Sequence, residues 1–184
     1  MKLKTLHFLE QNRRLRSHKL KELVQPLKDV GITANHLTLL SFICGLVAIY
    51  YLFEDHRLFV IFGLIHLFFD SIDGVLARLT KITDFGKYFD FFTDRIITIA
   101  LLTKTYLVVD ESIVIIILMF TIITEALYVF SDFQYPILFI RTTVMILFML
   151  NIITVGYWVA GIISLYSIIL QVNRYWELQV ANEP

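Results

Sequence analysis

Six blocks of mostly apolar residues dominate this sequence and leave little room for anything else. They cover residues 37–53, 58–79, 86–109, 112–131, 136–155 and 157–172. A stretch of about 20 apolar residues is long enough for a helix to cross the hydrocarbon core of a bilayer. Since 58% of the 184 residues are hydrophobic and the mean hydropathy is +0.73, the chain is predicted to be an all-α integral membrane protein, a bundle of six transmembrane helices.

The connections between the blocks are short, so we expect a single membrane domain over residues 1–184. Residues 1–35 are predicted to be a cytoplasmic juxtamembrane segment, residues 36–174 to hold the six spans, and residues 175–184 to form a cytoplasmic tail. The sequence shows no internal repeat and no low-complexity segment. Nothing in this organisation indicates a nucleic-acid partner.

The distribution of positive charge predicts the orientation, although the 16 Lys and Arg cancel the 16 Asp and Glu overall. Eight of the cations lie within the first 28 residues, which places the N-terminus in the cytoplasm by the positive-inside rule. Arg78, Lys81 and Lys87 flank the connection between the second and third blocks, on the same side. An even number of spans returns the C-terminus to the cytoplasm. We therefore expect a multi-pass protein of the cell (inner) membrane.

The segment before the first span is predicted to be an interfacial amphipathic helix. Leu20, Leu23 and Val24 fall at helical spacing among basic residues, and Leu27 continues the row just past Pro26. Such a pattern suits a helix that lies in the headgroup layer. Either it only fixes the topology, or it also gathers anionic lipid.

Four aspartates lie inside or at the ends of two predicted spans, where an uncompensated carboxylate is costly. Asp70 and Asp73 are three residues apart in the second span, and Asp90 and Asp94 are four apart in the third. Each pair therefore shares one helical face. A divalent cation is the compensation that we expect, and because no Cys or His cluster accompanies these carboxylates, the ligand set favours Mg²⁺, Mn²⁺ or Ca²⁺.

Other residues around the aspartates suggest a binding site for phosphate. Gly74 and Gly86 would let backbone or ligand approach closely where a side chain would block it. Arg78, at the end of the second span, offers a planar fork suited to a phosphate or a base edge. Mg²⁺ in turn usually acts on phosphates. The predicted site lies near the cytoplasmic membrane surface, where a nucleotide can reach it.

Eight residues in this window resemble the signature of the CDP-alcohol phosphatidyltransferase family, D-x-x-D-G-x-x-A-R, a spacer, and G-x-x-x-D-x-x-x-D. They are Asp70, Asp73, Gly74, Ala77, Arg78, Gly86, Asp90 and Asp94. The six-span layout with an N-terminal interfacial helix is also similar to that family. The spacer, residues 79–85, is one residue shorter than the usual form. Inside a helix one deleted residue would rotate the later aspartates by about 100°. In a loop it would be harmless, and residues 80–84 are predicted to be a loop.

The resemblance implies a role for each matched residue. Two divalent ions, Mg²⁺ or Mn²⁺, would be held on the diphosphate of a CDP-linked lipid by Asp70, Asp73, Asp90 and Asp94. The cytidine and phosphate portion would be bound by Gly74, Ala77, Arg78 and Gly86. Asp94 would also be the catalytic base, taking the proton from a small hydroxyl acceptor as CMP leaves. The resemblance further implies a homodimer, and Asn35 or Thr38 would contact the nucleotide phosphates, unless Asn35 only caps a helix.

The acceptor stays open at this point. Arg141, within the fifth span, and Arg95, beside the predicted base, are candidates for binding a phosphorylated polyol such as glycerol 3-phosphate or inositol phosphate. Arg141 would alternatively pair with Glu125 of the fourth span. Serine and free inositol compete as acceptors. A different class of function, a non-enzymatic carrier of divalent cations, would also use intramembrane aspartates, but it would not require Gly74 or Arg78.

Overall fold

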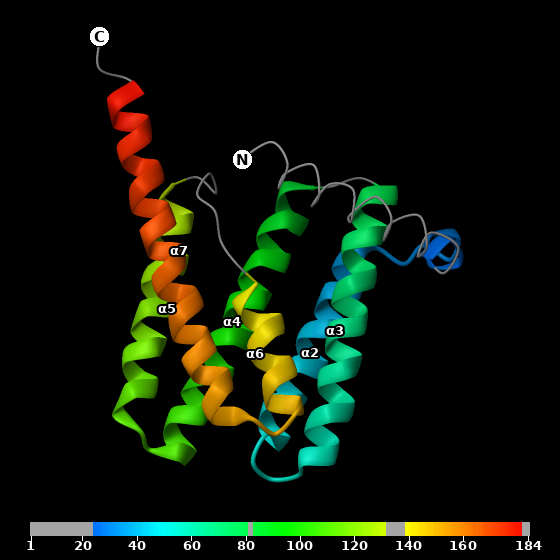
Figure 1. Ribbon diagram of the computed structural model, residues 1–184. Coiled ribbons are helices and arrows are strands. Elements are labelled where there is room, and N and C mark those ends of the chain that lie inside the picture. Colours follow the sequence, from blue (N-terminus) through cyan, green and yellow to red (C-terminus); the bar gives the residue numbers. More distant parts are fainter. Residues whose placement is uncertain (1–23, 81–82, 132–138, 182–184) are drawn as a thin grey trace. The chain divides into compact units, whose positions relative to one another are not determined.

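The computed structural model describes residues 24–80, 83–131 and 139–181. Its labelled helices are shown in Figure 1 and run in the order α2 (Ala34–Tyr51), α3 (His56–Leu79), α4 (Asp84–Val109), α5 (Ser112–Phe130), α6 (Ile140–Met149) and α7 (Ile153–Ala181). The all-α prediction is confirmed over the described residues. Two compact units divide the chain: the first comprises Met1–Gly45 and Leu64–Thr93, and the second comprises Leu46–Gly63 and Asp94–Pro184.

The first unit has a small apolar core where the start of α2 packs against the end of α3. Val24, Leu37, Ile72, Val75 and Leu76 are buried there. The three α3 residues recur at spacings of three and four, so they form one helical face directed at α2. This packing fixes the register between the two helices that carry most of the candidate site.

The predicted N-terminal amphipathic helix lies mostly outside the described residues. Its last part is helical over residues 24–29. A turn follows, in which Gly31 has a φ of 82°, a conformation that suits glycine. Val24 is fully buried in the core of the first unit, and Leu27 packs against the same core. These two side chains therefore contact protein, and a location of the preceding residues in the headgroup layer stays a prediction.

In the second unit, α7 packs against both α5 and α6. A Cβ added at Gly161 would lie 2.9 Å from Ile117 Cγ1, so this glycine allows α7 to approach α5 closely. Thr121 and Ser164 share a buried hydrogen bond of 3.0 Å between their hydroxyl oxygens. Small residues and hydroxyl pairs are what hold helices together where apolar burial gives no net driving force.

Four helical segments are long and apolar enough to cross a membrane: Ala34–Tyr51, His56–Leu79, Ser112–Phe130 and Ile153–Glu177. The predicted count of six is not confirmed. At 26 residues α4 has the length, but its charged residues exclude it from this set. With only ten residues, α6 is about 15 Å long, half the thickness of the hydrocarbon core.

The predicted boundary between the fifth and sixth spans was wrong. Instead of a span over 136–155, the structure ends α6 at Met149 and begins α7 at Ile153. Asn151 adopts a left-handed φ of 60°, its N–H donates to Phe148 O, and the Ile152 N–H donates to Leu147 O. This is a Schellman ending, which asparagine tolerates better than other non-glycine residues. The predicted tail, 175–184, also proved helical as far as Ala181.

Candidate functional site

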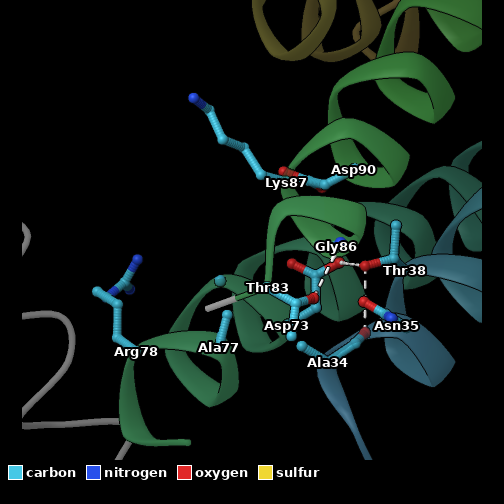
Figure 2. A pocket seen from close by; sticks show the side chains of 11 residues that line it. Ala34, Asn35, Thr38, Asp73, Ala77, Arg78, Thr83, Gly86, Lys87 and Asp90 are labelled. Carbon is cyan, nitrogen blue, oxygen red and sulfur yellow. Dashed lines mark hydrogen bonds between the residues drawn. The ribbon is translucent and has the colours of Figure 1, made fainter. Parts of the chain in front are cut away.

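A cavity of about 210 Å³ lies within the first unit, and several charged and polar residues contribute to its walls. Its walls come from the start of α2, the end of α3 and the start of α4, and its lining residues are shown in Figure 2: Ala34, Asn35, Thr38, Asp73, Gly74, Ala77, Arg78, Thr83, Gly86, Lys87 and Asp90. Typical ligand pockets measure roughly 300–1,000 Å³, so this cavity accommodates only part of a nucleotide-linked lipid.

Local sequence explains why α3 and α4 present these side chains together. Asp73, Ala77 and the neighbouring Gly74 and Arg78 lie within little more than one turn of α3, which ends at Leu79. Thr83 then caps α4, because its hydroxyl accepts a 3.0 Å hydrogen bond from the Gly86 N–H. In the described part of the spacer, Thr80 and Thr83 are outside the helices. The break between α3 and α4 therefore falls within the spacer, although Asp84, expected in the loop, already belongs to α4. The effect of the short spacer on the later aspartates stays a prediction.

The two helices bring together carboxylates that the sequence separates by 20 residues. Oxygen atoms of Asp70 on α3 and Asp90 on α4 lie within 4.8 Å of each other. Asp94 follows Asp90 by four residues on the same helix, one turn further along the same face. It is the first residue of the second unit.

Asp73 is the buried aspartate of the cavity, at 4% exposure. Its Oδ2 accepts a 2.8 Å hydrogen bond from the Thr38 hydroxyl of α2, drawn as a dashed line in Figure 2. A buried carboxylate needs such compensation. This contact orients Asp73 from a helix other than its own.

Both glycines of the predicted site are closely approached by polar side chains. A Cβ added at Gly86 would lie 2.8 Å from Asn35 Oδ1, closer than real Cβ atoms approach, and 3.0 Å from Thr83 Oγ1, a tight contact. A Cβ at Gly74 would lie 3.5 Å from an Arg78 guanidinium nitrogen, an ordinary contact. The Asn35 side chain thus occupies the space beside Gly86, whereas the predicted approach of backbone or ligand to the two glycines stays a prediction.

In the second unit, the two candidate acceptor residues each form an ion pair. Arg141 donates a hydrogen bond to Asp94 Oδ1, and Arg95 Nε lies 2.6 Å from Glu125 Oε2. The suggested alternative pairing of Arg141 with Glu125 was therefore wrong. Arg141 is the charged residue among the buried residues of α6, at 7% exposure, and a guanidinium buried in an apolar helix requires a partner of opposite charge.

Three residues of the cavity were missed or undervalued from the sequence. From the sequence, Lys87 was expected only to contribute to the orientation in the membrane, Thr83 to belong to a loop, and Thr38 to be one of two possible phosphate contacts. The signal for Lys87 was its position three residues before Asp90, on a neighbouring part of the same helical face. Thr38 and Asp73 are separated by 35 positions in the sequence, so no local sequence pattern predicts their contact.

The donor set fits a divalent cation. Asp70 and Asp90 place carboxylate oxygens within 4.8 Å of each other, and such oxygens are the ligands that Mg²⁺ and Mn²⁺ prefer. Asp73 lines the cavity together with Asp90 but lies outside that close group. The first residues of α2 and α4 line the same cavity, and the partial positive charge at helix N-termini favours phosphate. The cavity therefore has features for binding both a metal ion and a phosphate.

A protein-family model described as CDP-alcohol phosphatidyltransferase matches residues 31–172 of the chain. The chain belongs to the CDP-alcohol phosphatidyltransferase family. The matched residues include all four aspartates and most of the helical region, which confirms the resemblance found in the sequence. Together with the four apolar helices, membership of this family identifies the chain as a multi-pass membrane protein.

A curated relative in this family is the archaetidylinositol phosphate synthase of Pyrococcus horikoshii (strain OT-3). The two sequences are 34% identical over 79 residues. The match covers 42% of this chain and 42% of the relative, so less than half the length of that protein is represented. Its name states what that relative synthesises.

Proposed function

We propose that this protein transfers a phosphatidyl-type group from a CDP-linked lipid to a small hydroxyl acceptor, with release of CMP. The observation that carries the proposal is the cavity of the first unit. Six of the eight signature residues line it, and a seventh, Asp70, places an oxygen within 4.8 Å of an oxygen of Asp90. Membership of the CDP-alcohol phosphatidyltransferase family supports the same activity.

In the proposed reaction, the acceptor hydroxyl attacks the phosphorus nearest the lipid. A new P–O bond forms to the acceptor, the P–O bond to CMP breaks, and Asp94 takes the hydroxyl proton. Gly74, Ala77, Arg78 and Gly86 bind the CDP portion. This division of work suits phosphoryl transfer, which depends on positioning and charge stabilisation more than on covalent catalysis.

Asp70, Asp73, Asp90 and Asp94 are the proposed ligands of two Mg²⁺ or Mn²⁺ ions. Bound there, the ions would neutralise charge on the diphosphate and on the leaving group. We expect the first effect of Asp70→Asn to be weaker activation of the reaction by Mn²⁺. Unchanged activation by Mn²⁺ in that variant would count against the ligand role.

For the acceptor, we propose a phosphorylated polyol, with inositol phosphate first and glycerol 3-phosphate second. Two arginines support this choice. Arg141 pairs with Asp94, and Arg95 directly follows Asp94 in the sequence. A guanidinium binds phosphate through two parallel hydrogen bonds. The name of the Pyrococcus relative favours inositol phosphate. Serine and free inositol are the acceptors that would not need either arginine.

The site is proposed to face the cytoplasm, with both termini on that side. Eight cations precede residue 29, and Arg78 and Lys87 line the cavity itself. Cys44 is the single cysteine, so a Cys44→Ser protein with a new cysteine at Asp84 reports the sidedness. Labelling of that cysteine only by reagents applied outside the cell would contradict the orientation.

A single membrane domain and a homodimer complete the proposal, the second by analogy within the family. The oligomeric state in detergent and in lipid nanodiscs is measurable by light scattering and by chemical cross-linking. A protein that stays monomeric in both would remove the dimer from the proposal while leaving the activity untouched.

The decisive test is to incubate purified protein with Mn²⁺, a CDP-linked lipid and each acceptor in turn, and to measure CMP and the lipid product by mass spectrometry. CDP-diacylglycerol and its archaeal ether counterpart are supplied in parallel, because the residues that line the cavity do not indicate which type of lipid chain the donor carries. Release of CMP with inositol phosphate supports the full proposal. No CMP with any acceptor, together with passage of Mg²⁺ into proteoliposomes, would favour the cation-carrier alternative.

A further inference from the structure

The Thr38 hydroxyl occupies an unusual position in the first unit. Its oxygen lies 2.8 Å from Asp73 Oδ2 and 3.1 Å from Ala34 O, the carbonyl one turn earlier in α2. A hydroxyl has one proton to donate. Hydrogen bonds to a charged acceptor are shorter and stronger than those to a neutral carbonyl. The Thr38 hydroxyl therefore donates its hydrogen bond mainly to the Asp73 carboxylate, at the shorter distance.

Among the described threonines, Thr121 and Thr124 also reach a second helix, at Ser164, but the second contact of Thr38 is to a carboxylate. Several others make only the local bond. The hydroxyls of Thr80, Thr93, Thr98 and Thr105, for example, donate to the carbonyl four residues earlier in the same chain segment. That local bond is the usual way for a threonine to satisfy its hydroxyl in an apolar helix. Thr38 has the same option in Ala34 O, and its contact with Asp73 is therefore an additional interaction directed at the cavity.

Neighbouring contacts hold Thr38 in this register. One turn further along α2, the Ser41 hydroxyl donates to His66 O at 2.9 Å, and His66 Nδ1 lies 2.9 Å from Ser41 O. Leu37 packs in the apolar core against α3 residues. Thr38 is 5% exposed and Asp73 is 4% exposed. The pair thus lies on a closely packed seam between α2 and α3, where neither side chain has room to rotate freely.

We propose that Thr38 is a positioning residue for cation binding: its hydroxyl holds the Asp73 carboxylate in the orientation that binds a divalent ion. The inference rests on the ligand role given to Asp73 in the proposed function. Outer partners of this kind fix ligand orientation, and their loss typically lowers metal affinity by about 10 to 100-fold.

The experiment measures Mn²⁺ binding directly, independently of turnover. Purified wild type and variants in nanodiscs are titrated with Mn²⁺, and the free ion is followed by electron paramagnetic resonance. Thr38→Val removes the hydroxyl at nearly constant volume, and Thr38→Ser keeps it. Thr105→Val is the matched control. Thr105 is fully buried, and its hydroxyl donates to the carbonyl oxygen of Leu101, one turn earlier in its own helix.

We expect Thr38→Val to weaken Mn²⁺ binding by about tenfold or more, Thr38→Ser to keep the wild-type affinity, and Thr105→Val to leave it unchanged. Asp73→Asn sets the size of the full loss. Wild-type affinity in Thr38→Val would overturn the proposal, as would equal losses in Thr38→Val and Thr105→Val. If the valine variant does not fold, Thr38→Ala takes its place under the same criteria.

The outcome is separable from the test of activity. Weakened Mn²⁺ binding in Thr38→Val, combined with no CMP release by wild type, would support the positioning role and reject the transferase. CMP release by wild type with unchanged Mn²⁺ binding in Thr38→Val would do the reverse. Mn²⁺ binding that does not depend on Asp73 would overturn the positioning role at its first premise.

Discussion

Arg141 of α6 and Asp94 of α4 form a hydrogen-bonded ion pair within the second unit. The Arg141 side chain is 8% exposed and that of Asp94 is 25% exposed. Each charge therefore compensates the other in surroundings that solvate neither well. Asp94 is also the proposed base, so the same carboxylate has a structural partner in α6 and a proposed role in the reaction.

Replacing Asp94 by asparagine should abolish turnover while leaving CDP-lipid binding largely intact. The amide keeps the size of the side chain but cannot accept the acceptor proton, and general-base groups typically contribute 10² to 10⁴-fold, so we expect a loss of at least about 100-fold. CMP release and binding of a fluorescent CDP-lipid measure the two effects separately. Glu54→Gln is the control, since Glu54 is an exposed carboxylate 3.9 Å from Lys104. Retained activity in Asp94→Asn would remove Asp94 as the base.

Arg141→Gln should raise the KM for a phosphorylated acceptor more than that for an unphosphorylated one. The substitution removes the charge that would bind the acceptor phosphate, and charge-assisted hydrogen bonds contribute about 1.5–3 kcal/mol, corresponding to roughly 10 to 150-fold. Steady-state kinetics with inositol phosphate and free inositol give the comparison. Arg141→Lys keeps the charge and loses the bidentate geometry. Equal changes for both acceptors would leave Arg141 only as the partner of Asp94.

Gly86→Ala should reduce activity by displacing the Asn35 side chain. The added Cβ would lie 2.8 Å from Asn35 Oδ1, so the amide must move out of its place in the cavity wall. If this contact is the cause, the double variant Gly86→Ala with Asn35→Ala should lose no more than Asn35→Ala alone. Measuring CMP release for the four proteins completes the cycle. Additive losses would instead indicate that a ligand needs the space at Gly86.

Glu125→Ala should destabilise the fold, because it removes the carboxylate that lies against Arg95 in a poorly solvated site, and breaking a buried ion pair in this way typically costs about 3–5 kcal/mol. Arg95 Nε and Glu125 Oε2 are 2.6 Å apart, and their side chains are 17% and 9% exposed. Replacing both residues, as Arg95→Met with Glu125→Leu, should recover most of this loss. Denaturant unfolding in detergent, followed by circular dichroism, measures both effects. A Glu125→Ala protein as stable as wild type would show that solvent or lipid headgroups compensate Arg95.

The turn between α6 and α7 should respond to backbone conformation alone. Asn151 has a φ of 60° and is exposed, so Asn151→Gly should be neutral or slightly stabilising, whereas Asn151→Val should cost about 1–2 kcal/mol. Thermal unfolding of the two variants distinguishes them. Asn151→Ala serves as an intermediate case with a Cβ but no branching. Equal stability of the glycine and valine variants would contradict the left-handed turn.

Much of the helical layout was predictable because it depends on local sequence. The structure places α3 at His56–Leu79 and α4 at Asp84–Val109, against predicted spans of 58–79 and 86–109. Long apolar runs must satisfy their backbone hydrogen bonds internally, and a helix does so without any tertiary partner. The break at Asn151 was missed because an apolar run continues on both sides of it, and hydropathy does not register a single left-handed residue.

The aspartates and glycines of the site were likewise identifiable from their spacing, since three- and four-residue intervals place side chains on one face of a helix wherever that helix lies. The partners of those residues were decided only by tertiary packing. Thr38 contacts Asp73, Asn35 closes over Gly86, and Arg141 pairs with Asp94 where Glu125 was the expected alternative. Each contact joins different helices, and which faces meet depends on how side chains interlock along the whole length of the helices, which no short window of sequence contains.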